Sequence, residues 1–104
     1  MKMLSVVLLL AAVSPGPWGD LDATTTSLPD GRTMVELDWT YAFPWAANLA
    51  IFRDGKFAGI APCNAKKWVT VEGAPGAYVY TVAFVWEWPT NSWYVLDEVT
   101  VNVR

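Results

Sequence analysis

The side chains that perform most enzyme chemistry are sparse in this sequence. It contains no histidine and a single cysteine, Cys63, among 104 residues. The acidic residues are scattered except for the pair Asp97-Glu98, whose side chains would point to opposite faces of a strand. Asp20 and Asp22 would share a face, where they fit either a calcium site or a solvated acidic edge. Serine and threonine hydroxyls have no histidine to activate them. We therefore expect no catalytic residue, no metal site and no cofactor.

Aromatic side chains are better suited to a function, and that function is binding. Seven tryptophans are present, and many of the aromatic residues gather in two segments, 41–45 and 86–94. Flat rings beside threonine, asparagine and glutamate can stack on sugars, and tryptophan and tyrosine also dominate protein interfaces. The alternative is that the tryptophans of residues 86–94 continue the inward register of their strands and cap the core. The predicted binding patch comprises Tyr41, Phe43, Trp45, Trp88 and Tyr94.

Composition and charge limit the range of partners. The length fits one domain, and a hydrophobic content of 54% is ample for a core. A net charge of −3 leaves no basic stripe for phosphate, so nucleic acid is not an expected partner. A single cysteine cannot form an internal disulfide, so a hydrophobic core must hold the fold together.

The first residues are typical of a secretory signal. Lys2 precedes a short apolar run that extends to Val13, and Ser14-Pro15-Gly16-Pro17 then forms a stiff linker. The run is shorter than the ~20 residues that span a bilayer. We expect residues 1–19 to precede the domain and residues 20–104 to form it. If the segment is retained instead, residues 1–14 would contact a membrane or a partner.

Strand signals fill the rest of the chain. Alternation with a period of two predicts half-buried strands, and the tight turns Pro29-Asp30-Gly31, Asp54-Gly55 and Pro75-Gly76 separate several of them. Residues 20–28 are expected to form an edge strand and residues 61–65 a loop. The residues expected to face inward are Val35, Leu37, Trp39, Leu49, Ile51, Tyr78, Tyr80, Val82, Phe84, Trp86, Val99 and Val101.

Between residues 21 and 103 the chain resembles a fibronectin type III module. The resemblance rests on Trp39 in the second strand, the hairpin phrase of residues 49–55, Trp68 near the start of the fifth strand, and the Pro75-to-Val82 phrase. It implies an all-β fold, a seven-stranded antiparallel immunoglobulin-like sandwich, with both aromatic segments at one end. It also implies that the Tyr78 hydroxyl bonds backbone in a nearby connection. Gly73 departs from the family pattern, which has a large apolar residue there.

Two functions fit these features. The first is an exported, non-catalytic binding or adhesion module that presents its aromatic end to a protein or glycan. Its location would be secreted or on the extracellular surface. The second is a structural subunit of a virion (a decoration protein), a surface layer or a filament, which would self-assemble through the retained N-terminal segment. The fate of residues 1–14 distinguishes the two.

Overall fold

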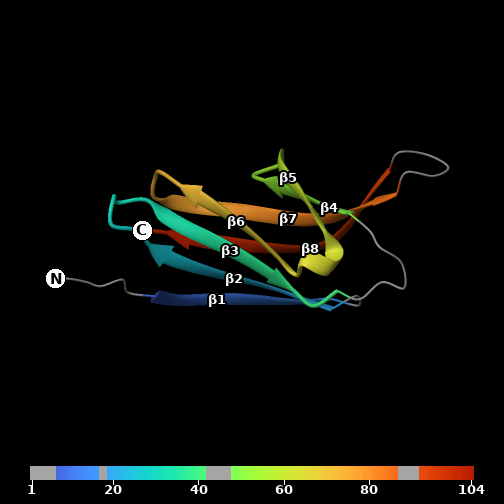
Figure 1. The fold of residues 1–104 in the computed structure, drawn as a ribbon, viewed down its shortest axis with the longest axis horizontal. Helices are drawn as coiled ribbons and strands as arrows, with labels where there is room; N and C mark the ends of the chain where they lie inside the picture. The colour runs from blue at the N-terminus through green and yellow to red at the C-terminus, as the bar shows by residue number, and fades with distance from the viewer. Residues whose placement is uncertain (1–6, 17–18, 42–47, 87–91) are drawn as a thin grey trace.

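The protein is an all-β sandwich of two antiparallel four-stranded sheets (Figure 1). The computed structural model describes the backbone of residues 7–16, 19–41, 48–86 and 92–104, and the side chains of residues 19–41, 48–84 and 95–104. The strand order is β1-β2-β3-β6 in the first sheet and β5-β4-β7-β8 in the second. The strands are β1 (Val7–Gly16), β2 (Gly19–Ser27), β3 (Thr33–Trp39), β4 (Asn48–Arg53), β5 (Lys56–Pro62), β6 (Lys67–Glu72), β7 (Gly76–Trp86) and β8 (Ser92–Val103).

The core lies between the sheets and consists of the alternating apolar residues of both. Every residue expected to face inward is buried, apart from Trp86, whose side chain lies outside the described residues. Trp39 is 2% exposed, and its indole N–H donates to the Cys63 carbonyl at 2.8 Å. Trp68 packs against the edge of the core, with its ring centroid 6.3 Å from that of Tyr80. The period-two pattern therefore predicted the inner faces correctly.

An additional strand precedes the seven that the sequence predicts. The backbone of β1 pairs with β2 from Val7 opposite Thr26 to Gly16 opposite Gly19, with a register shift between Leu8 and Ala12. The segment expected to precede the domain therefore forms an edge strand, at the bottom of Figure 1. As a result, β2 is an inner strand and not the edge strand that its polar composition suggested.

The connection after β5 also differs from the prediction. Residues 61–65 were expected to form a loop, but β5 continues to Pro62 and a single 3-10 turn, Cys63–Ala65, follows it. Lys66 then takes a left-handed conformation with φ 68°, which reverses the chain into β6. Within the described residues, no helix is long and apolar enough to cross a membrane.

Candidate functional site

A groove opens where the edges of the two sheets approach each other, between β5 and β6. Its volume is about 440 Å³. The β4–β5 hairpin forms one wall, and β6 forms the other. Within the described part of the chain, β5 pairs only with β4 and β6 only with β3, so both walls are open strand edges. The lining residues are Arg53, Asp54, Lys56, Phe57, Ala58, Trp68, Thr70, Val71 and Glu72.

A β-bulge in β5 lies in one wall of the groove. Phe57 pairs with Phe52 and Gly59 pairs with Ile51, so Ala58 has no partner on β4. Such a bulge bends the strand that carries it. At Gly59 the two edges touch, because a Cβ atom there would lie 2.9 Å from the indole nitrogen of Trp68. The groove is therefore closed at Gly59 and Trp68, and its other lining residues on this hairpin lie toward the tip.

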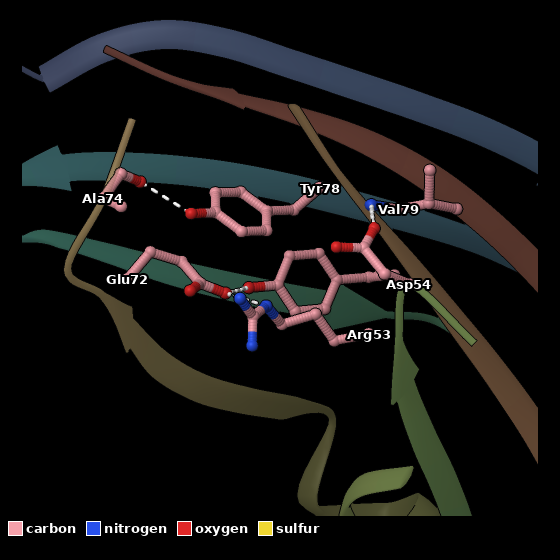
Figure 2. Close-up of polar contacts among 7 residues, drawn as sticks. Arg53, Asp54, Glu72, Ala74, Tyr78 and Val79 are labelled. Carbon is pink, nitrogen blue, oxygen red and sulfur yellow. Dashed lines mark hydrogen bonds and ion pairs between the residues drawn. The ribbon is translucent and has the colours of Figure 1, made fainter. Parts of the chain in front are cut away.

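An ion pair between the half-exposed Arg53 and the buried Glu72 lines the groove (Figure 2). Glu72 is 5% exposed, and its Oε2 lies 2.9 Å from Nε of Arg53. The Tyr80 hydroxyl donates to the same Glu72 oxygen. A buried carboxylate needs such partners, because an unpaired charge in the interior is strongly destabilising. Burial raises the pKa of Tyr80, and the bond to Glu72 raises it further, so Tyr80 stays a hydrogen-bond donor at neutral pH.

Arg53 is held in place while part of it remains accessible. Its guanidinium carbon lies 4.7 Å from the ring centroid of Tyr78, a cation–π distance. Its side chain is nevertheless 45% exposed, and in Figure 2 one terminal nitrogen points away from Glu72. Arginine carries five N–H donors, so donors remain available for a ligand. The groove thus contains a pre-positioned cation.

The hairpin tip beside Arg53 is fixed to β7. Asp54 and Gly55 have φ values of 51° and 82°, as a two-residue type I′ turn requires. The Asp54 carboxylate accepts from the Val79 N–H at 2.9 Å, and the Asp54 N–H donates to the Val79 carbonyl at 2.8 Å. The hairpin wall of the groove is therefore anchored to the second sheet.

Tyr78 makes the bond that the family resemblance implies. Its hydroxyl donates to the Ala74 carbonyl at 2.7 Å, across the connection between β6 and β7 (Figure 2). The side chain is 8% exposed. The Tyr78 ring also contacts Arg53, so the residue that makes the corner bond supports the arginine of the groove.

Exposed apolar side chains are concentrated beside the groove. Among the residues whose side chains are described, five large hydrophobic residues are exposed, and four of them are on β5 and β6, the two edge strands that border the groove. Phe57 and Ile60 are on β5 and are 60% and 56% exposed. Val69 and Val71 are on β6 and are 44% and 40% exposed. The fifth, Val95, is on β8, at the opposite edge of the second sheet.

The chain segment that carries both walls of the groove has a charge opposite to that of the rest of the chain. Residues 53–72 contain four basic and two acidic side chains, whereas the other residues contain three basic and eight acidic ones. The basic residues are Arg53, Lys56, Lys66 and Lys67. A positive edge on an acidic protein attracts negatively charged partners.

The predicted aromatic patch is not assembled from the described residues. Tyr41 is 1% exposed and belongs to the core, so its assignment to an exposed patch is wrong. Burial raises the pKa of its hydroxyl, and the nearby Asp97 carboxylate raises it further. Phe43, Trp45 and Trp88 lie outside the described residues, as does the side chain of Tyr94. For these four residues the patch stays a prediction.

A second polar cluster lies on the outer face of the first sheet. Asp22 pairs with Asp38 across β2 and β3, and Lys67 pairs with Asp38 across β3 and β6. Partial burial raises the pKa of Asp38 to about 6, and the neighbouring Glu36 carboxyl contributes to the rise. No three acidic or cysteine side chains among the described residues are arranged to hold a metal ion. This cluster is therefore expected to affect the stability of the fold and its dependence on pH.

Sequence reasoning missed the groove, although one signal for it was present. In β6, Trp68, Thr70 and Glu72 point inward, yet Val69 and Val71 on the outward face are also apolar. Apolar residues on the solvent side of an edge strand suggest a partner, because exposed edges are usually protected by charges.

Comparison of the chain with protein-family models, curated proteins and solved structures finds no match in any of the three.

Proposed function

We propose that this protein is an exported, non-catalytic binding module of the fibronectin type III-like class, and that it binds a partner at the groove between β5 and β6. Two features support the class. From β2 onward, β2, β3 and β6 belong to one sheet and β4, β5, β7 and β8 to the other, a division that suits an immunoglobulin-like sandwich. The Tyr78 hydroxyl is bonded to backbone four residues upstream, as in a tyrosine corner.

The observation that carries the binding proposal is the position of the exposed apolar side chains. Four of the five described ones are on β5 and β6, the strands that border a groove with a fixed, half-exposed arginine inside it, and Phe57 and Val71 line that groove. A binding site needs apolar area and a few oriented polar groups, and this edge supplies both. The burial of Tyr41 weakens the case for the aromatic end. The sheet edge is therefore the preferred surface for a protein or glycan.

A display experiment tests the proposal. A random peptide library is selected on the immobilised full chain, and the protein is also applied to a polysaccharide panel. Ligands from either source are retested on Phe57→Ser/Val71→Ser and on the matched control Val95→Ser, after circular dichroism has shown that both variants fold. We expect at least a tenfold loss of affinity for the double variant and little change for the control. Ligands that bind all three proteins equally would refute a binding role for the groove.

One observation favours the structural-subunit alternative. The described part of the hydrophobic N-terminal segment, β1, pairs with β2 between Val7 and Gly16 with one register shift, so this part has a place in the folded molecule. A segment retained in this way could also pair with a neighbouring subunit. The intact mass of the mature protein decides between the two functions. A mass that includes residues 1–14 favours the subunit, and a mass without them favours the exported module.

A further inference from the structure

The open edge of β6 has the features of a site for strand addition. β6 spans six residues, Lys67–Glu72, and among the described residues no strand covers its outer edge. Such an edge presents a row of backbone N–H and C=O groups that can pair with an extended peptide. At about 3.3 Å per residue the edge is roughly 20 Å long, enough for a peptide of six to eight residues.

The two faces of an added strand would meet different surroundings. Its outward side chains would lie beside Val69 and Val71, which are exposed and apolar. Its inward side chains would point into the groove, toward Trp68 at the closed end and toward Arg53 and Lys56 at the open end. Directly opposed side chains on neighbouring strands contribute roughly 0.2–1 kcal/mol per pair when they match. A matching peptide therefore has β-branched residues outward and at least one carboxylate inward.

The charge distribution identifies the chemistry of the partner. The segment that carries both walls of the groove, residues 53–72, has two more basic than acidic side chains, whereas the remainder of the chain has a large excess of acidic groups. The two carboxylates that line the groove, those of Asp54 and Glu72, already have partners within the protein. We infer that the groove takes an extended acidic peptide, which pairs with the free edge of β6 and places a carboxylate on the exposed side of Arg53 and near Lys56. This inference rests on the proposed function, because it names the partner for the same groove.

A competing explanation is that the lysines protect an open edge. Charged side chains, especially lysine, often prevent edge-to-edge aggregation. That explanation accounts for Lys56, Lys66 and Lys67, but it gives no role to Arg53, which is held by Glu72 and Tyr78 inside the groove. Nor does it account for Phe57, Val69 and Val71, which would promote aggregation if nothing covered them.

The test uses two synthetic eight-residue peptides added to the full chain. One alternates valine with glutamate and the other alternates valine with lysine. Isothermal titration measures affinity, and amide hydrogen exchange reports on β6. We expect the acidic peptide to bind at least tenfold more tightly than the basic one, with an affinity that falls as salt is added. We also expect it to slow exchange at alternate β6 amides.

Two further comparisons locate the contacts. Lys56→Glu should reduce the affinity for the acidic peptide at least tenfold, whereas Arg104→Glu, the same charge change after β8, should change it less than threefold. N-methylation of alternate peptide residues should abolish binding for one set of positions and not for the other, because only one set faces β6.

The possible outcomes separate the two proposals. Strand addition is overturned if both peptides bind with equal affinity. It is also overturned if N-methylation of either set of positions has the same effect on the affinity of the acidic peptide. Another outcome is that the binding of selected peptides or polysaccharides depends on Phe57 and Val71 while the acidic peptide does not bind. In that case the proposed binding function is supported and the acidic peptide is refuted as the partner. A dimer that forms without peptide and disappears in Val71→Ser would assign the edge to a second copy of the chain. That result would also refute the acidic peptide as the partner.

Discussion

At the scale of single residues, two tyrosine hydroxyls bond to acceptors of different strength. Tyr78 bonds the carbonyl of Ala74, whereas Tyr80 bonds the buried carboxylate of Glu72. Tyr78→Phe should lower the free energy of unfolding by about 1 kcal/mol, the scale of a neutral hydrogen bond. Tyr80→Phe should cost about 2 kcal/mol or more, because the buried Glu72 side chain loses a hydrogen-bond donor. Urea denaturation of the two variants measures the difference, and equal losses would contradict the assigned partners.

A second residue-scale prediction concerns Asp38. Its pKa is raised from 3.8 to about 6, so the folded state binds a proton more readily than the unfolded state. The free energy of unfolding should therefore rise as the pH falls from about 6 to about 4. Above pH 6 the ionised Asp38 carboxylate should lower it by the full amount. Asp38→Asn should remove this dependence and, after solvent screening, stabilise the protein at pH 7 by about 1 kcal/mol.

The control for Asp38 is a carboxylate with the opposite shift. The backbone N–H of Arg32 lowers the pKa of the exposed Asp30 carboxyl, and the Arg32 side chain lowers it further. Asp30→Asn should therefore not gain stability at pH 7. Thermal melts of the wild type and both variants between pH 4 and pH 8 make the comparison. A pH profile of Asp38→Asn parallel to that of the wild type would show that Asp38 ionises normally.

At the scale of elements, the contact between β5 and β6 depends on the absence of one side chain. A Cβ atom at Gly59 would lie between 2.9 and 3.2 Å from three atoms of the Trp68 ring. Gly59→Ala must therefore displace Trp68, and overpacking of this kind typically costs 1–3 kcal/mol. Ala58→Gly, at the unpaired bulge position next to it, is the control for a backbone effect. Denaturant titration and chemical shifts of the Trp68 indole report the change, and an unperturbed indole would contradict the contact.

Several elements could be predicted from the sequence because local physics determines them. Alternation fixes the inner faces of β3, β7 and β8, and Asp54-Gly55 fixes the hairpin because both residues tolerate a positive φ. Tyr41 was also in the inward register of β3, so its burial follows from the same alternation that the predicted patch disregarded. The strand β1 could not be recognised, because a short apolar run fits a signal segment and a strand equally well.

The groove could not be predicted because it is a property of the whole molecule. It requires the bulge at Ala58, the contact of Gly59 with Trp68, and the meeting of Arg53 with Glu72 across 19 positions of the chain. None of these is encoded in a local pattern. What the sequence does contain is the composition of the two edges, positive and apolar together, which becomes informative once the edges are known to lie side by side.

At the scale of the whole molecule, the decisive question is whether β1 belongs to the native fold. Deletion of residues 1–18 would expose the edge of β2, which otherwise pairs with β1 from Gly19 to Thr26. Contacts between β1 and β8 across the sandwich would also be lost. If β1 is integral, the truncated chain should lose about 2 kcal/mol of stability, which lowers Tm by roughly 10 °C for a domain of this size. Amide exchange should accelerate throughout β2, while β4 and β7 keep their protection.

The matched control keeps the length of the chain and breaks only the pairing. Replacing Ala12 and Ser14 with proline removes two backbone donors that could pair with β2 and leaves the remainder of the segment in place. This variant should resemble the deletion in Tm and in β2 exchange if pairing is what stabilises the domain. A truncated chain that melts at the wild-type temperature, with β2 fully protected, would instead show that residues 20–104 form the complete domain. In that case the segment before them would be a leader that folding does not require.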